Sequence, residues 1–164
     1  MCAINGILRA QGRSAEELGF DESMVRAMNA ATAHRGPDGT NLWADACCTL
    51  GHNRLAVIDL SSAASQPMRS ASGQYSVVFN GEIYNYRELK RELSSYPYQS
   101  SSDTEVILAA YEAWGTDAFA KLRGMFAFAL WDTEEKELVV VRDQAGIKPL
   151  FWRTADDSFF FSSE

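Results

Sequence analysis

Cysteine, histidine and positive charge are all scarce in this chain. Its 164 residues include three cysteines and two histidines, and 22 acidic side chains outnumber 15 basic ones, which leaves a net charge of −7. No basic stripe is available to meet phosphates, so nucleic acid is excluded as the main partner. Cys2, Cys47 and Cys48 give neither a metal-ligand spacing nor an even-numbered disulfide framework, which indicates a reducing cytoplasm.

Long hydrophobic runs are absent as well. No apolar stretch is long enough to span a bilayer, and the N-terminus lacks the basic and apolar regions of a signal peptide, so we expect no membrane association. The chain is 46% hydrophobic and 12% aromatic, as ordinary globular proteins are. Its length fits a single domain, residues 1–164, that can bury roughly two-thirds of the surface exposed by the unfolded chain.

Hydrophobic periodicity and turn residues predict an α+β protein. An opening strand at 4–8 is followed by a polar turn at 11–14 and a helix at 20–32. Further helices are expected at 87–93 and 103–114, and further strands at 42–44, 48–50, 55–60, 75–79, 124–132, 138–142, 149–152 and 158–162. The strand at 75–79 is expected to stop at an Asn80-Gly81 turn. Because the helices are grouped instead of alternating with strands, a layered α+β fold is favoured over a doubly wound sheet.

Cys2 stands directly behind the initiator methionine. Removal of Met1 is expected before a small residue, and it would give Cys2 a free α-amine beside its thiol. The amine titrates at about pH 8 and the thiol at about pH 8.5, so one residue could act as nucleophile and base. Most free cysteines are small buried hydrophobes, and position alone is therefore weak evidence for catalysis.

Four polar clusters elsewhere in the chain need an explanation. They are His34-Arg35-Gly36-Pro37-Asp38, Gly51-His52-Asn53-Arg54, Asn80-Gly81-Glu82 and Ser101-Ser102-Asp103-Thr104-Glu105. Taken singly, each has a structural interpretation: a packed histidine, a surface ion pair of Arg54, a hairpin turn, or a helix N-cap at Asp103. Neither histidine has a second one at metal spacing, so we predict no metal site.

Together these residues fit a pocket for a free amino acid. Arg54 offers a bidentate guanidinium for an α-carboxylate, and Asp103 or Glu82 offers a carboxylate for the ammonium group. An amide under attack also needs donors for its developing oxyanion. The Asn80 side-chain amide and the Gly81 backbone N–H, on a tight turn, would supply them.

Ordered sequence blocks extend through nearly the whole chain. They are Cys2-Ala3-Ile4-Asn5-Gly6, His34-Arg35-Gly36-Pro37-Asp38, His52-Asn53-Arg54-Leu55, Gln66-Pro67-Met68, Asn80-Gly81-Glu82-Ile83-Tyr84-Asn85, Ser102-Asp103-Thr104-Glu105, Leu122-Arg123-Gly124-Met125-Phe126-Ala127 and Arg142-Asp143 through Gly146-Ile147-Lys148-Pro149-Leu150. In this order they resemble the class II glutamine amidotransferase domain, specifically the N-terminal glutaminase domain of glutamine-hydrolysing asparagine synthetases.

The resemblance implies an N-terminal-nucleophile hydrolase with a four-layer αββα sandwich, in which two antiparallel sheets lie between helical layers. It implies Cys2 as the nucleophile with its own α-amine as base, and Asn80 with Gly81 as the oxyanion hole. The implied glutamine contacts are Arg54, Leu55, Ala56, Val57, Ile58, Asn80, Gly81, Glu82 and Asp103. The reaction would be thiolate attack, ammonia release, a glutamyl thioester, and hydrolysis to glutamate.

The resemblance also implies a longer protein. Glutamine is the expected substrate, and a C-terminal ATP-dependent amide synthetase domain is the expected partner and receiver of ammonia. No P-loop pattern occurs here, so ATP and Mg²⁺ are expected only in that other domain and no cofactor in this one. The ammonia acceptor and the formation of a homodimer stay open.

Ala3, Asn5 and Gln144-Ala145 depart from the family pattern. Asn5 places an amide in an otherwise apolar strand, where it must find partners. Gln144-Ala145 lie in a block that faces the synthetase domain in this family. These departures keep a second hypothesis open, a catalytically silent domain that docks a natural-product or sugar-modifying amide synthetase. A third hypothesis is an N-terminal-nucleophile enzyme that acts on another amide.

Overall fold

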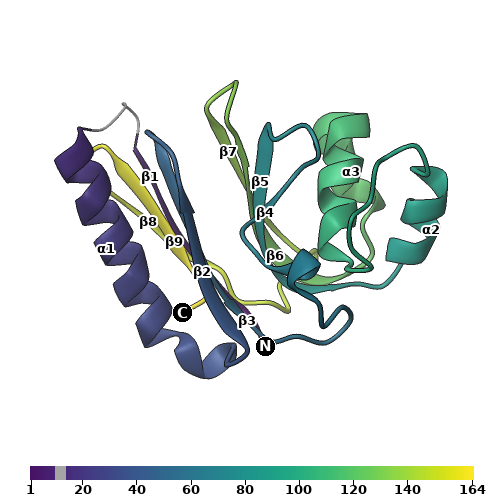
Figure 1. Ribbon diagram of the computed structural model, residues 1–164, viewed down its shortest axis with the longest axis horizontal. Coiled ribbons are helices and arrows are strands. Elements are labelled where there is room, and N and C mark those ends of the chain that lie inside the picture. The colour runs from purple at the N-terminus through teal and green to yellow at the C-terminus, as the bar shows by residue number, and fades with distance from the viewer. Residues whose placement is uncertain (10–13) are drawn as a thin grey trace.

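Two antiparallel sheets lie face to face between two helical layers in the computed structural model, which describes residues 1–9 and 14–164 (Figure 1). Within these residues, one sheet has the strand order β2-β3-β1-β9-β8 and the other has the order β4-β5-β6-β7. The strands are β1 (Ala3–Arg9), β2 (Gly39–Ala44), β3 (Cys48–Arg54), β4 (Met68–Arg69), β5 (Tyr75–Ile83), β6 (Gly124–Asp132), β7 (Glu137–Arg142), β8 (Phe151–Ala155) and β9 (Ser158–Ser162). The helices are α1 (Ala15–Ala31), α2 (Tyr86–Glu92) and α3 (Thr104–Trp114), with short 3-10 helices at Ala33–Arg35, Ser62–Ala64 and Gly115–Lys121. The predicted four-layer α+β sandwich is confirmed.

Helix α1 covers the outer face of the five-stranded sheet, where it packs on β1 and β3 (Figure 1). It begins earlier than the helix predicted at 20–32, because Ser14 and Glu17 form a capping box: the Ser14 N–H donates to the Glu17 carboxylate at 2.9 Å. Of the turn predicted at 11–14, residues 11–13 lie outside the described part of the chain. No described helix is long and apolar enough to cross a membrane.

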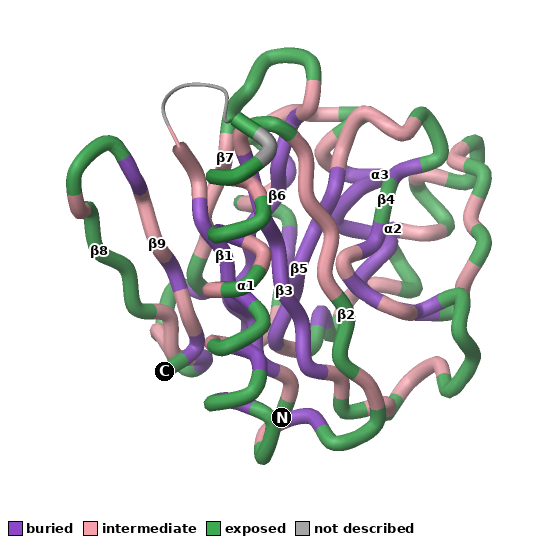
Figure 2. The backbone as a smooth tube through the Cα atoms, turned by 60° about the vertical axis from the view of Figure 1, so that its left-hand side comes forward, coloured by how far each residue is buried: buried purple, intermediate pink, exposed green. Residues whose placement is uncertain are grey.

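Strand β6 is covered on both faces, as its nearly continuous apolar sequence predicts. Its alternate residues Phe126, Phe128 and Leu130 belong to the core beneath α2 and α3. Ala127, Ala129 and Trp131 belong to the core between the two sheets. Figure 2 shows that the central strands β1, β3 and β5 are also buried, in the middle of the molecule, while the edge strand β8 is exposed.

The strand predicted at 55–60 is wrong, because this segment is a loop. Its first N–H groups are bound by side chains and not by a neighbouring strand. The Leu55 N–H donates to Cys2 Sγ at 3.3 Å, and the Ala56 N–H donates to the Asp38 carboxylate at 2.8 Å. The beginning of the loop is therefore bound to Cys2 and Asp38 and does not extend the sheet.

The turn predicted at Asn80-Gly81 is also wrong. Strand β5 continues through both residues and pairs with β6 as far as Ile83, which lies opposite Gly124. Glycine is needed at this position because of packing and not because of a turn: a Cβ at Gly81 would lie 2.7 Å from Cα of Phe126. Glycine here allows β6 to approach closely.

Asn5, the amide in the apolar strand β1, has the partners that burial requires. Its Nδ2 donates to Asn29 Oδ1 at 2.8 Å and to Thr32 Oγ1 at 3.0 Å, and its Oδ1 accepts from Ser162 Oγ at 2.6 Å. This departure from the family pattern therefore ties β1 to α1 and to β9.

Candidate active site

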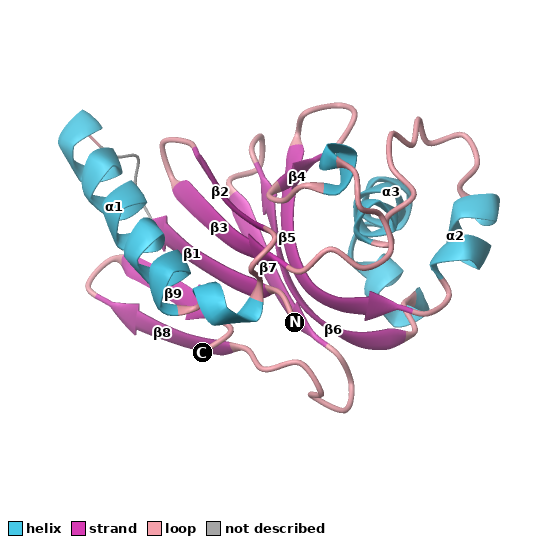
Figure 3. Ribbon diagram, turned by 60° about the horizontal axis from the view of Figure 1, so that its bottom comes forward, coloured by secondary structure: helices cyan, strands magenta, loops and turns pink. Residues whose placement is uncertain are grey.

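A cavity of about 190 Å³ opens where the N-terminus meets the end of β3, the edge of β5 and the start of α3. Figure 3 shows the N-terminus lying between the two sheets. Every residue predicted for the nucleophile, the oxyanion hole and the glutamine pocket lines this cavity: Cys2, Arg54, Leu55, Ala56, Val57, Ile58, Asn80, Gly81, Glu82 and Asp103. The structure thus brings together groups from four separate parts of the sequence.

Cys2 is half-buried immediately before β1, and its Sγ accepts the Leu55 N–H. Burial raises the pKa of the Cys2 thiol, and nearby Asp103 raises it further. The Leu55 N–H, the N-terminal ammonium and Arg54 act in the opposite direction. Because burial is the largest effect, the thiol needs a base to become a thiolate at neutral pH.

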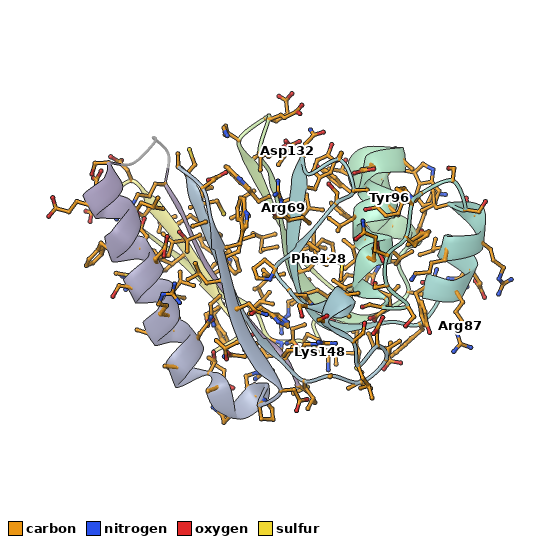
Figure 4. The ribbon with its side chains drawn as sticks, in the orientation of Figure 1. Arg69, Arg87, Tyr96, Phe128, Asp132 and Lys148 are labelled. Carbon is orange, nitrogen blue, oxygen red and sulfur yellow. The ribbon has the colours of Figure 1, made fainter. Side chains whose placement is uncertain are left out.

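The backbone around Cys2 is held by Arg35. Its Nε donates to the Cys2 carbonyl at 3.1 Å, and its own carbonyl accepts the Met1 ammonium at 3.0 Å. The Met1 side chain lines the cavity, and Lys148 Nζ donates to Met1 Sδ at 3.1 Å. Lys148, in the lower half of the molecule in Figure 4, is only 6% exposed. In this form the Cys2 nitrogen belongs to the Met1–Cys2 peptide bond, and Met1 occupies part of the pocket.

The edge of β5 presents backbone donors to the cavity. Strand β4 pairs with Ser76 and Val77, and beyond them this edge has no neighbouring strand in the described part of the chain. The Phe79 N–H donates to Gln66 Oε1 at 2.6 Å, and the Ile83 N–H donates to Asp103 Oδ2 at 2.9 Å. Since alternate residues of a strand direct their N–H groups to the same side, the Gly81 N–H lies between these two and faces the cavity.

Asn80 supplies the second donor of this site. Its side chain is 1% exposed, and its Nδ2 has no hydrogen-bond partner among the residues that the structure describes. A buried donor without a partner costs about 1–3 kcal/mol, and native proteins rarely leave one without a reason. An oxyanion formed beside Cys2 would satisfy this group together with the Gly81 N–H.

Arg54 and Asp103 provide the opposite charges that a zwitterion needs. The Arg54 guanidinium donates to the backbone carbonyl of Asp59 and makes no ion pair in the described part of the chain. Asp103 is 5% exposed, and burial raises the pKa of its carboxyl. Asp103 occupies the N-cap position of α3, but Ser102 Oγ and not Asp103 accepts the Thr104 N–H. Although Asp103 Oδ2 accepts the Ile83 N–H, the carboxylate keeps further acceptor positions for an ammonium group.

His52, one of the two histidines, connects the sheets and does not enter the cavity. It is fully buried in β3, and its Nε2–H donates to the Phe79 carbonyl in β5 at 3.2 Å. Burial lowers the pKa of His52 to about 4, against the effect of that hydrogen bond. The structural interpretation of this residue fits its position.

The free energy of unfolding is expected to fall as the pH drops from about 6.5 to about 4. In this range the unfolded chain protonates His52 and the folded chain does not, so acid favours unfolding by about 3 kcal/mol in total. Urea unfolding at several pH values measures the effect, and His52→Gln, which keeps a donor for Phe79, should flatten the curve by that amount. Parallel curves for the two proteins would contradict the assignment.

Sequence reasoning gave no role to several residues that shape the cavity. Gln66 joins β5 to α3, since its Oε1 binds the Phe79 N–H and its Nε2 donates to Thr104 Oγ1 at 3.2 Å. Asp38 and Asp59 hold the loop at 55–60. These three residues lie in or near the polar motifs, which could have indicated a role at the site. Their hydrogen-bond partners are distant in the sequence, so only the fold reveals what that role is. No group of three His, Cys, Asp or Glu side chains that could hold a metal occurs within the described residues.

Two antiparallel sheets between helical layers, with a cysteine next to the N-terminus in a cavity where the sheets meet, are the arrangement of an N-terminal-nucleophile hydrolase fold. The chain is similar in structure to the glutamine phosphoribosylpyrophosphate amidotransferase of Bacillus subtilis, with a TM-score of 0.76 and 22% identity over 99% of this chain and 42% of that one. The family model of the glutamine amidotransferase domain matches residues 1–164. The chain therefore belongs to the glutamine amidotransferase family.

Curated relatives narrow the comparison within this family. The chain is 39% identical to asparagine synthetase [glutamine-hydrolyzing] 1 of Bacillus subtilis and 41% identical to a putative asparagine synthetase [glutamine-hydrolyzing] of Mycobacterium tuberculosis. Each match covers the whole chain but only 26% and 27% of the relative, so the chain spans about a quarter of their length. The chain matches the N-terminal glutaminase part of these synthetases, and the alternative of a catalytically silent docking domain is not favoured.

Proposed function

We propose that this domain hydrolyses the side-chain amide of glutamine to glutamate and ammonia through a thioester on Cys2. The observation that carries the proposal is the Asn80 Nδ2, which has no partner among the described residues and is buried in the same cavity as the Cys2 thiol. Arg54 and Asp103 in that cavity bind the α-carboxylate and the α-ammonium of the substrate. Other residues of the lining, at 55–58 and Glu82, enclose its methylene chain and amino end.

The reaction begins after removal of Met1, when the α-amine of Cys2 is free. This amine takes the proton of the thiol, and the thiolate attacks the amide carbon of glutamine. Asn80 Nδ2 and the Gly81 N–H donate to the oxyanion, and the intermediate collapses as the amine returns the proton to the leaving ammonia. A water molecule then attacks the glutamyl thioester, which releases glutamate and restores the thiol.

The ammonia passes, in this proposal, to an ATP-dependent amide synthetase domain within a longer cytoplasmic protein. The support is the length of the relatives, of which this chain matches about a quarter. ATP and Mg²⁺ would be needed in that other domain, while the chemistry above uses only side-chain and backbone groups. Asparagine synthesis is the proposed use of the ammonia, on the strength of the relatives' names.

A diazo-ketone analogue of glutamine tests the proposal directly. We expect one label per chain, on Cys2, with glutamine protecting the thiol and with Cys47 unlabelled, since Cys47 lies outside the cavity. Intact mass should show that Met1 is removed before the reagent is added. A processed protein that takes up no label at Cys2 would overturn the proposal.

A further inference from the structure

The loop at 55–60 carries much of the proposed glutamine pocket, yet little apolar packing holds it. Val57 and Leu60 are 73% and 76% exposed. Polar contacts must therefore fix its position. At its beginning, the Asp38 carboxylate accepts the Ala56 N–H at 2.8 Å.

At its end, the Asp59 carboxylate joins the loop to a segment 42 residues further along the chain. Oδ1 accepts the N–H and the hydroxyl of Ser61 at 2.8 and 2.7 Å, and Oδ2 accepts the N–H and the hydroxyl of Ser101 at 2.8 and 2.9 Å. Hydrogen bonds to an ionised group are the stronger kind. They hold the pKa of the Asp59 carboxyl far below its usual range, with the Ser61 hydroxyl contributing most, so the group is ionised at neutral pH.

Asp59 contacts both ends of the proposed zwitterion site. Its backbone carbonyl accepts from the Arg54 guanidinium, which is the proposed carboxylate contact. Its side chain binds Ser101, two residues before Asp103, which is the proposed ammonium contact. Each Asp59 carboxylate oxygen already accepts two hydrogen bonds, so the side chain acts through its neighbours and not on the substrate.

We propose that Asp59 is a positioning residue for substrate binding: its carboxylate ties the loop at 55–60 to the segment that carries Asp103 and so fixes the spacing of Arg54 and Asp103. This role rests on the proposed glutamine pocket. The two charges must reach two different substituents of one α-carbon at the same time, so a loose loop weakens binding. The bond-breaking steps at Cys2 do not involve this contact.

Asp59→Asn tests the role, because the amide keeps the shape of the side chain but removes the charge that strengthens the bonds to Ser101 and turns one of the two acceptors into a donor. We expect the KM for glutamine to rise about tenfold or more, with kcat within about twofold of wild type. Asp132→Asn is the matched control. Asp132 accepts the N–H groups of Glu134 and Glu135 in the turn after β6. It lies in the upper part of Figure 4, away from Lys148 and the cavity. Loss of the Asp132 carboxylate should leave the KM for glutamine unchanged.

Glutamine binding in a Cys2→Ala background separates this proposal from the proposed function. Calorimetry should show that adding Asp59→Asn raises the Kd by the same factor, even if the wild type hydrolyses no glutamine. Ser101→Ala removes only one hydroxyl and serves if Asp59→Asn fails to fold. Ser101→Ala should raise the Kd less than Asp59→Asn does. The double variant should have the same Kd as Asp59→Asn alone. An unchanged Kd in the folded variants, an equal rise in Asp132→Asn, or a fall in kcat at constant KM would overturn the proposal.

Discussion

We expect glutamate release to fall roughly a thousandfold or more when Cys2 is replaced by alanine, while glutamine should still bind. Alanine removes the only thiol that lines the cavity among the described residues, and no neighbouring group there can form the thioester. Alanine is also small, so Met1 should be removed as in the wild type and the α-amine should remain. The loss therefore reports on the thiol and not on the processing of the chain.

The measurement is glutamate production by wild type and Cys2→Ala, with intact mass to establish the N-terminus of each. Cys47→Ala makes the same chemical change at a half-buried cysteine outside the cavity and should keep full activity. Equal rates in wild type and Cys2→Ala would show that another group performs the hydrolysis.

Asn80→Ala is expected to lower kcat by about 100- to 1,000-fold, because one donor to the oxyanion is lost. The amide nitrogen has no partner among the residues that the structure describes, so its removal breaks no hydrogen bond seen there. Binding of glutamine depends mainly on Arg54 and Asp103, and the KM should therefore change little. Steady-state glutamate release gives both constants.

Two comparisons make the Asn80 result specific. Alkylation of Cys2 by iodoacetamide forms no oxyanion, so its rate should be unchanged in Asn80→Ala. Asn85→Ala removes a second asparagine of the same motif, whose side chain binds the backbone of Lys121 and Arg123 and lies outside the cavity. It should lower stability but not kcat. A large rise in KM at constant kcat in Asn80→Ala would contradict the oxyanion role.

The sequence predicted the layers of the fold and the members of the site better than the local path of the chain. Strands at β6 and β9 were predicted with their observed bounds, because each is a short apolar run followed or preceded by turn residues. The loop at 55–60 and the Asn80-Gly81 segment were predicted wrongly. Both errors have one cause: the local signal was overruled by partners from distant segments, such as Asp38 for the loop and β6 for Gly81.

The site residues were gathered by resemblance, and local chemistry explained why each type suited its role. What the sequence did not reveal is how these groups are held. Gln66, Asp59 and Arg35 each bind backbone atoms of remote segments, and no periodicity or motif spacing encodes such pairings. Supporting contacts of this kind become visible only when the fold is known.

The free edge of β5 constrains how this domain can change in evolution. Three alternate N–H groups on that edge serve three different acceptors: Gln66 for Phe79, the proposed oxyanion for Gly81, and Asp103 for Ile83. A substitution at exposed Glu82 leaves this alternation intact. An insertion or deletion of one residue between 79 and 83 would reverse it on one side of the change, so that the three N–H groups would no longer face the same way. The length of this short segment should therefore be fixed more strictly than most of its side chains.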